Sequence, residues 1–233
     1  MTPSQIIDHQ SPNFDDRPAG KNPDMLILHY TGMKTAEESL ARLRDPVAKV
    51  SAHYLIDEDG ALYRLVDEAR RAWHAGVSHW AGETDINSCS LGIELQNPGH
   101  EFGYRAFPDA QMTALTDLCA EILSRHAIPA GRILGHSDVA PSRKEDPGEL
   151  FDWRRLAAAG IGRLPRNPAS PASPASPARM DDREARAALT AIGYDPGAPL
   201  ADILTAFQRH YRQTKIDGQF DTRTAGLIRA LAG

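Results

Sequence analysis

A Pro/Ala/Ser stretch constrains this chain more than any other feature of its sequence. Residues 164–178 read LPRNPASPASPASPA. Proline lacks an amide donor and has a fixed φ, while alanine and serine offer little apolar area to bury. We therefore expect an extended, semi-stiff linker that does not join a packed core. It divides the chain into a domain at 1–162, a linker at 163–179 and a small domain at 180–233.

The overall composition excludes several classes of protein. The chain has 233 residues, of which 41% are hydrophobic and 24% charged, a typical balance for a folded chain. No run approaches the ~18 apolar residues of a membrane helix, so we expect no membrane span. Two cysteines are too few for a disulfide scaffold. A net charge of -5 argues against a nucleic-acid partner bound through its phosphates.

The larger segment has the pattern of a mixed α/β domain. Apolar residues recur at helical spacing between Pro108 and Ala127, which predicts an amphipathic helix. Short apolar or alternating runs are typical of strands. They occupy Met25–His29, Ala52–Ile56, Ala61–Val66, Ser90–Leu95 and Ile133–Gly135. The turn Asp57–Gly60 between the second and third runs predicts a hairpin.

The segment after the linker has only helical signals. Asp181 and Asp182 can cap a helix that runs to Ile192, and Gly193 follows as a stop signal. A second apolar stripe covers 200–207. A third helix begins after Asp221 or Thr222, and the sequence leaves open which of the two is the cap. These signals predict a small all-α bundle.

Two histidines and one aspartate follow predicted strands of the larger domain. His29 ends its strand, His136 follows Ile133–Gly135, and Asp146 lies in the loop beyond. Two His and one Asp fit a catalytic zinc site with three protein ligands and one open position. No local motif of the HExxH kind supports this spacing, so on the residues alone a structural role for each histidine stays open.

Five segments, in order, resemble the zinc-dependent N-acetylmuramoyl-L-alanine amidases of the AmpD/AmiD type, the amidase_2 family. They read LILHYTG, VSAHYLIDEDG, RRAWHAGVSHW, INSCSLGIELQNPG and GHSDVAPSRKEDPG. The resemblance covers roughly residues 10–157 and implies a central mixed sheet flanked by helices, with zinc in a surface groove. The C-terminal pattern AIGY…ILTAFQRHY…KIDGQFDTRTAGLI resembles the three-helix peptidoglycan-binding module of type 1.

The resemblance assigns a role to five residues. His29, His136 and Asp146 match the zinc ligands. Glu94 matches the acid that serves as general base, and Lys144 matches the lysine that stabilises the oxyanion. These roles make chemical sense, because amide hydrolysis needs a nucleophile at neutral pH, a cation where negative charge develops and a proton for the leaving amine.

Other positions match residues that hold the muramyl-peptide in relatives. These substrate-binding candidates are Lys49, Trp73, His74, Asn87 and Arg143. Lys49 stands where cytoplasmic relatives carry an arginine, so it keeps the charge but loses the bidentate fork. Core packing is a serious alternative for Trp73. His53 is interpreted as support behind the site, hydrogen-bonded rather than on the metal.

The expected function is hydrolysis of the bond between N-acetylmuramic acid and L-alanine in peptidoglycan recycling, by a monomer. The alternatives are an exported or phage-type amidase that degrades intact peptidoglycan, and a non-catalytic recognition protein. The N-terminal residues lack a signal-peptide pattern, which favours the cytoplasm. A wall-binding module favours intact wall, so export by another route stays open.

Overall fold

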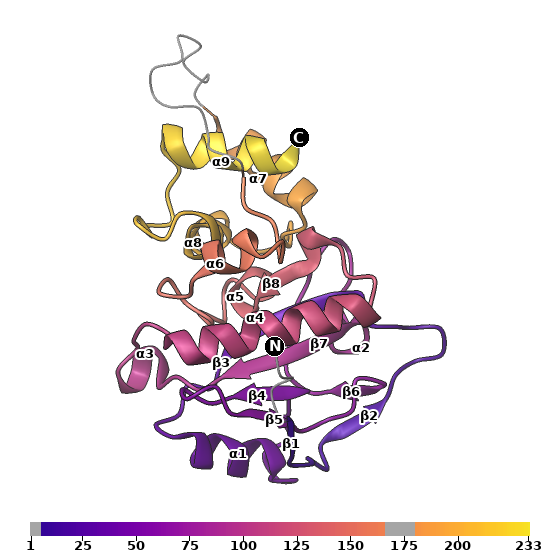
Figure 1. Cartoon of the computed structure of the whole chain (residues 1–233). Helices are drawn as coiled ribbons and strands as arrows, with labels where there is room; N and C mark the ends of the chain where they lie inside the picture. The colour runs from indigo at the N-terminus through magenta and orange to yellow at the C-terminus, as the bar shows by residue number, and fades with distance from the viewer. Residues whose placement is uncertain (1–5, 166–179) are drawn as a thin grey trace.

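The structure, a computed structural model, describes residues 6–165 and 180–233 (Figure 1). The predicted linker at 163–179 lies outside these residues except for its first positions, 163–165. Within the described ranges, the chain has no helix that combines the length and apolar character needed to cross a bilayer.

A mixed six-stranded sheet forms the centre of the larger part of the molecule. Its order is β1 (Ile6–Asp8), β5 (Leu62–Arg64), β4 (Tyr54–Ile56), β7 (Ser90–Leu95), β3 (Met25–Tyr30) and β8 (Ile133–Gly135). Only β4 and β5, the predicted hairpin, pair antiparallel within it. A separate two-stranded sheet pairs β2 (Phe14–Asp16) with β6 (Arg70–Ala72). The predicted mixed α/β fold class is confirmed.

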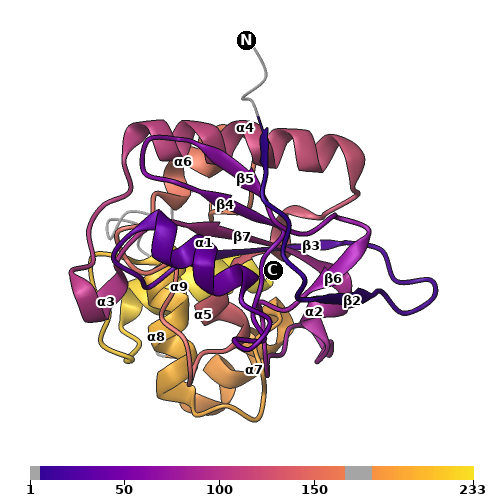
Figure 2. The same ribbon diagram turned by 90° about the horizontal axis from the view of Figure 1, so that it is seen from below.

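Alternation along β3 sends its side chains to opposite faces of the sheet. Leu26 and Leu28 join the core beneath α4 (Asp109–Arg125), whereas Met25 and Ile27 join a second core on the other face. Because side chains alternate with period two, His29 shares the face of Met25 and Ile27. Figure 2 shows α4 on one side of the sheet and α1 (Ala36–Arg44) on the other. The side chain of His29 therefore lies on the face of the sheet away from α4.

Several short helices lie between the strands and after the last one. They are α2 (Ile86–Cys89), α3 (Gly99–Phe102), the 3₁₀ turn η1 (Ala130–Arg132), α5 (His136–Val139) and α6 (Trp153–Ala158). On α1, the side chain of Thr35 caps the helix by accepting the amide of Glu38, and Leu40 and Leu43 pack against Leu55 of β4.

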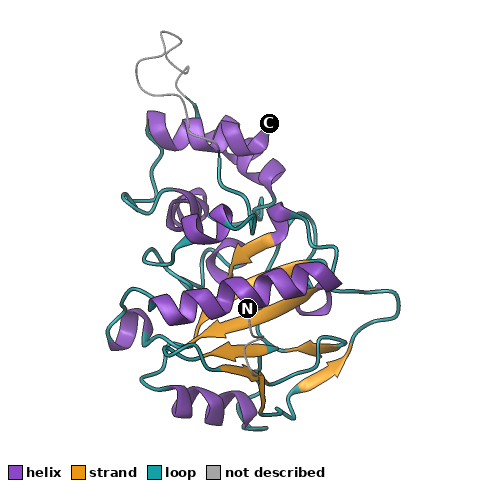
Figure 3. Ribbon diagram, in the orientation of Figure 1, coloured by secondary structure: helices purple, strands orange, loops and turns teal. Residues whose placement is uncertain are grey.

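The C-terminal residues form the three expected helices, drawn in purple above the sheet in Figure 3. These are α7 (Asp182–Ile192), α8 (Leu200–Tyr211) and α9 (Thr222–Ala232). Asp181 accepts the amide of Glu184 at the start of α7, and Asp221 accepts the amide of Thr224 at the start of α9. The cap of the third helix is therefore Asp221.

The C-terminal helices share a hydrophobic core with the sheet, which the sequence analysis did not anticipate. Met25, Ile27 and Leu134 lie in one cluster with Leu204 and Phe207 of α8. Trp80, for which the sequence suggested no role, packs edge-on against Tyr194 with 4.9 Å between ring centroids. The division at 1–162 and 180–233 stays a prediction, but the two parts pack as one body in this structure.

Candidate metal centre and active-site groove

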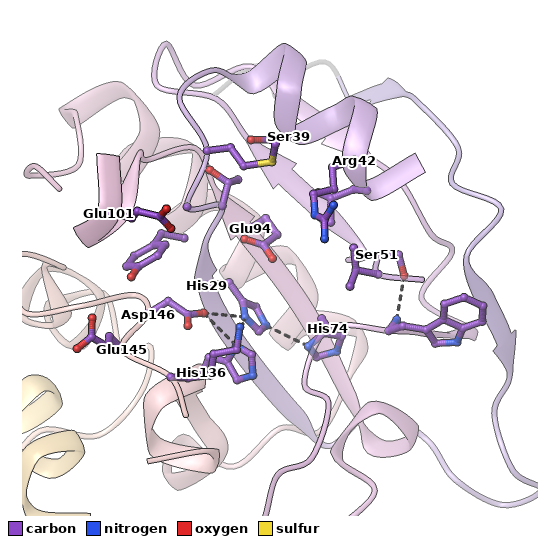
Figure 4. Close-up of a pocket in the computed structure, with 18 of the residues that line it drawn as sticks. His29, Ser39, Arg42, Ser51, His74, Glu94, Glu101, His136, Glu145 and Asp146 are labelled. Atoms are coloured by element: carbon purple, nitrogen blue, oxygen red, sulfur yellow. Dashed lines mark hydrogen bonds and ion pairs between the residues drawn. The ribbon is translucent and has the colours of Figure 1, made fainter. Parts of the chain in front are cut away.

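Neighbouring strands bring the candidate catalytic residues to one edge of the sheet. His29 is the second-last residue of β3 and lies in register with Glu94 of parallel strand β7. β8 pairs with β3 on its other side and leads directly into α5, whose first residue is His136. The loop beyond α5 returns Asp146 to the same place. Figure 4 shows these four side chains converging from β3, β7, α5 and the loop.

Three donor atoms meet at this point. Nδ1 of His29 lies 2.9 Å from Nδ1 of His136, and Oδ2 of Asp146 lies 3.0 Å from the first and 3.1 Å from the second. All three side chains are buried, with exposed fractions of 1%, 3% and 5%. The structure therefore places the three ligands expected from the sequence in mutual contact.

Hydrogen bonds behind His136 leave its Nδ1 without a proton. Nε2 of His136 lies 3.0 Å from the carbonyl oxygen of Ala75, and a carbonyl can only accept. The Nε2–H of His136 therefore donates to Ala75. In a neutral imidazole the other nitrogen then carries a lone pair, and this lone pair points at the cluster.

A longer relay fixes His29 in the same way. The hydroxyl of Ser90 donates to the carbonyl of Ile86 at 2.6 Å, so its oxygen accepts from Nε2–H of His74 at 3.1 Å. Nδ1 of His74 then accepts from Nε2–H of His29 at 3.0 Å. This order of donors leaves Nδ1 of His29 as a lone pair facing Asp146.

The donor set fits a zinc ion. In the tautomers that the bonds to Ala75 and His74 favour, two imidazole lone pairs and a carboxylate oxygen face one another at about 3 Å. A cation between them satisfies all three acceptors at once. Two His nitrogens with one carboxylate oxygen are also a donor set that catalytic zinc accepts, leaving a fourth position open.

The protonation of the buried groups agrees with this chemistry. Burial and the neighbouring His136 lower the pKa of His29 to about 4, so His29 is neutral at pH 7. Burial also holds the pKa of His74 well below its usual value. His29 therefore needs to lose no proton before it binds a cation.

Glu94 lies beside the cluster with an unsatisfied oxygen. Its Oε2 is buried and has no hydrogen-bond partner among the described residues. Burial, followed by the negative charge of Asp146, raises its pKa well above the usual value, whereas Lys144 acts in the opposite direction. Glu94 and Lys144 line the same pocket as the three ligands. An unpaired carboxyl in a pocket is a candidate proton carrier.

A glycine in β7 makes room for the relay. Nearest to a Cβ built on Gly92 is the ring of His74, at 2.5 Å, closer than real Cβ atoms approach. Gly92 lies between Ser90 and Glu94 on the same face of β7. The glycine in SLGIEL therefore allows the imidazole to lie directly on the strand.

The three candidate ligands lie in a groove. One pocket of about 550 Å³ contains the cluster, and a neighbouring pocket of about 490 Å³ continues past Trp73. Lys49 lines the second pocket, and Trp73 and Arg143 line both. The Trp73 indole donates to Asp15 at 2.7 Å and stays partly exposed, so Trp73 lies on the groove wall rather than in the core.

The remaining candidates from the sequence have supporting positions. Oδ1 of Asn87 accepts the backbone amides of His74 and Ala75, so Asn87 shapes the segment beneath the groove. Nδ1 of His53 accepts the amide of Gly92 at 2.9 Å, and burial and Arg17 lower its pKa to about 3. His53 is fully buried and lies outside the ligand cluster, as the sequence analysis expected.

Some groove residues carried no signal in the sequence. Arg42 on α1 and Tyr30 at the end of β3 line the pocket, as do His100, Glu101 and Glu145. Arg42 reads as an ordinary basic residue in the last turn of a helix. Only the packing of α1 over the sheet edge places it at the groove (Figure 4).

Comparison with known proteins identifies the family to which this chain belongs. Residues 19–149 match the family model Amidase_2, described as N-acetylmuramoyl-L-alanine amidase. The N-acetylmuramoyl-L-alanine amidase AmiD of Escherichia coli is 34% identical over 227 residues, covering 89% of this chain and 81% of AmiD. The 1,6-anhydro-N-acetylmuramyl-L-alanine amidase AmpD of Haemophilus influenzae is 35% identical over 64% of this chain and 89% of its own.

Solved structures extend the likeness to most of the chain. AmpDh3 of Pseudomonas aeruginosa in complex with anhydromuramic pentapeptide superposes with a TM-score of 0.80 at 32% identity, covering 92% of each chain. AmiD of E. coli in complex with anhydro-N-acetylmuramic acid-L-Ala-D-gamma-Glu-L-Lys gives a TM-score of 0.79 over 94% of this chain and 96% of its own. The matched family model and these relatives agree with the geometry of the site, and the chain belongs to the Amidase_2 family of N-acetylmuramoyl-L-alanine amidases.

Proposed function

We propose that this chain is a zinc-dependent amidase that cleaves the bond between N-acetylmuramic acid, or its 1,6-anhydro form, and the L-alanine of the stem peptide. The observation that carries the proposal is the convergence of His29, His136 and Asp146 beside Glu94, in an open groove. The first three hold the metal and the fourth moves protons. Family membership supports the same reaction.

The three ligands and Glu94 have different roles in the proposed reaction. When bound by His29, His136 and Asp146, zinc supplies a Lewis acid for the carbonyl and lowers the pKa of water to about 7. The Glu94 carboxylate takes the proton of the attacking water as the water oxygen bonds to the lactyl carbonyl carbon. Glu94 keeps that proton until the C–N bond breaks. The proton then passes to the alanine nitrogen, which leaves as an amine.

Lys144 provides positive charge on the same pocket wall. It lies two residues before Asp146 and lines both parts of the groove. Negative charge grows on the carbonyl oxygen when water attacks, and a fixed ammonium group stabilises that charge more than it stabilises the neutral amide. The products are a muramyl carboxylate and a stem peptide with a free amino group.

The groove residues bind the glycopeptide in this proposal. Lys49 and Arg143 place positive charge beside the ligands, which suits the carboxylates of a stem peptide, and Trp73 offers a ring face to its apolar parts. His74 and Asn87 also line the second pocket, while their hydrogen bonds support His29 and the 74–75 backbone.

Small recycling fragments are the proposed substrates. AmpD of H. influenzae is named for the 1,6-anhydro substrate, and the titles of the AmiD and AmpDh3 complexes name anhydromuramyl peptides. We further propose a monomer in the cytoplasm, with residues 180–233 as a peptidoglycan-binding module. Mass measurement in solution, cell fractionation and pull-down on purified sacculi test these three points separately.

One comparison of substrates tests the proposed function. Purified chain with zinc is incubated with 1,6-anhydro-muropeptide and, separately, with intact sacculi, and free stem peptide is measured by mass spectrometry. We expect faster release from the anhydro-muropeptide. Release from sacculi alone would support the alternative of a wall-degrading amidase. Zinc binding without release from either substrate would support a recognition protein.

A further inference from the structure

Two of the three metal ligands lie on one short piece of chain, which we term the ligand segment (residues 136–146). It begins with His136, ends with Asp146 and carries Lys144. A backbone hydrogen bond of 2.9 Å from the Ser137 amide to the Asp146 carbonyl closes it on itself. The segment contains only one short helix, α5, so its position depends on the elements that pack against it.

At its first end, the ligand segment is held by a buried carboxylate. Asp138 is fully buried, and its Oδ2 accepts the amide of Gly135 at 2.8 Å. The C-terminal helices supply two more donors. The Tyr194 hydroxyl donates to Oδ1 at 2.6 Å, and Nδ1–H of His210 donates to Oδ2 at 2.7 Å. Asp138 therefore joins the residue before His136 to both α8 and the turn after α7.

The ring of His210 is locked in place. It stacks on Trp153 with 3.7 Å between centroids and an interplanar angle of 16°. On its own helix it stacks on Tyr211 at 3.9 Å and 3°. Trp153 belongs to α6, so the imidazole lies against both parts of the molecule. This stacking orients Nδ1 toward Asp138.

The neighbouring residue of α8 holds the second end. Arg209 donates to Oε1 of Glu145 at 2.8 Å, and its Nε lies 3.8 Å from Oε2 of Glu149. Glu145 stands between Lys144 and Asp146, a catalytic candidate and a metal ligand. The Arg209 side chain is 13% exposed and the Glu145 side chain is 49% exposed, so packing fixes the arginine while the carboxylate of the pair faces solvent.

We infer that Arg209 and His210 of α8, together with Tyr194, are positioning residues for the metal centre. Two consecutive residues of one helix hold the two ends of the ligand segment. They fix the separation of His136 and Asp146 before the metal arrives. The inference goes beyond the proposed reaction, because it gives the C-terminal helices a role in the metal centre in addition to the proposed wall binding.

Apolar packing alone does not explain these contacts. The shared core already joins α8 to the sheet. A buried carboxylate adds to this only if every oxygen meets a donor, since an unpaired one costs free energy. Asp138 meets three donors, and two of them come from the C-terminal residues, His210 on α8 and Tyr194 in the turn after α7. Such polar contacts specify one geometry, whereas apolar contacts tolerate small shifts.

Zinc affinity of the full-length chain tests the inference. Affinity is measured by competition with a chromogenic chelator, and deuterium uptake is measured for peptides covering the ligand segment. We expect Arg209→Met and Tyr194→Phe each to weaken zinc binding about 10-fold, the lower end of the range for groups that orient ligands. Faster exchange in the ligand segment accompanies the loss. Arg186→Met is the matched control, because Arg186 donates to the carbonyl oxygens of Pro196 and Ala198 in the loop between α7 and α8.

A pair of variants separates the hydrogen bond of His210 from its stacking. Asn in place of His210 keeps a donor near Nδ1, whereas Phe keeps the stacked ring. We expect His210→Asn to bind zinc more tightly than His210→Phe. Zinc affinity and exchange equal to wild type in Arg209→Met and Tyr194→Phe, even with a lowered melting temperature, would overturn the inference alone. A wild-type chain that binds no zinc would refute it together with the proposed metal site.

Discussion

Two buried clusters of similar composition lie on either side of the ligand segment. Asp146 contacts His29 and His136, and Asp138 contacts His210 and Tyr194. Each contains a carboxylate within about 3 Å of imidazole nitrogen. At Asp138 each oxygen accepts a hydrogen bond from an identifiable donor. At Asp146 the two imidazole nitrogens that approach it carry lone pairs, because their protons are donated elsewhere.

This difference distinguishes a structural cluster from a metal site. A carboxylate with its donors in place stabilises packing, as Asp138 does between α5 and α8. Three acceptors brought together without protons require a cation instead. Residue types alone do not separate the two cases. The direction of each hydrogen bond does separate them, and groups such as Ala75 and Ser90, which lie outside the proposed ligand cluster, set that direction.

The largest effect is expected from a substitution that removes one of the three candidate metal ligands. Asp146→Ala removes one of three donors and leaves two neutral imidazoles. We expect zinc affinity to fall by more than the ~100-fold that loss of an orienting group costs, and turnover to fall with it. Metal analysis after gel filtration measures the zinc. Asp109→Ala, at an exposed acid on α4, is the control. Zinc content unchanged in Asp146→Ala would rule out its role as a ligand.

The next prediction distinguishes proton transfer from metal binding. Glu94→Gln keeps the shape of the side chain but removes its acid-base function. We expect zinc content to stay at the wild-type level while kcat falls about 10²–10⁴-fold. Lys144→Met should lower kcat by about 10²–10³-fold, also with zinc retained. Glu121→Gln on α4 is the control. Wild-type turnover in Glu94→Gln would mean that another group carries the proton.

A smaller effect tests the relay behind His29. Ser90→Ala removes the acceptor of His74, and His74→Phe removes the acceptor of His29. Since these bonds hold the lone pair of His29 toward the cluster, we expect zinc affinity to fall about 10–100-fold. His126→Gln is the control, because His126 pairs with Glu68 instead. Equal zinc affinity in all three variants would remove the relay from the account.

The smallest effect concerns pH. The pKa of His53 is about 3 in the folded chain and 6.5 when unperturbed, so the unfolded chain binds the proton more readily. Its contribution to stability is therefore complete above pH 6.5 and is lost as the pH falls below that value. With zinc removed by chelation, we expect His53 to contribute about 1.5 kcal/mol to the drop in unfolding free energy between pH 6.5 and pH 5. His29 and His74, whose pKa values are also lowered, add to this drop, and Glu94, whose pKa is raised, opposes it. Urea titrations at both pH values measure it, and equal stability would contradict the buried neutral state.

Much of the fold could be predicted from the sequence, because local pattern determines it. The strands at Met25–His29 and Ser90–Leu95 and the helix near Pro108–Ala127 follow from runs and periodicity, and the structure places elements at each. The candidate ligands His29, His136 and Asp146 were identified from the order of five sequence motifs along the chain, not from the spacing between the ligands. Because β3 and β8 are neighbouring strands, the fold then brings His29 close to His136 and to the loop that carries Asp146.

The contacts between distant segments could not be predicted. The Pro/Ala/Ser stretch suggested a tethered, separate domain, and nothing in local sequence shows that Trp80 packs on Tyr194. His210 reads as one more polar residue of an amphipathic helix. Its contact with Asp138 depends on how α8 lies against α5. His74 looked like a groove residue, and only its partners Ser90 and His29 reveal the relay.

Zinc-dependent release of stem peptide tests the central claim most directly. The chain is stripped with a chelator, zinc is added back in known amounts, and release from 1,6-anhydro-muropeptide is followed. If His29, His136 and Asp146 hold the catalytic zinc, activity is absent without metal, rises with added zinc and reaches a plateau at one zinc per chain. Full activity in the stripped chain, or no activity at any zinc concentration, would contradict this account.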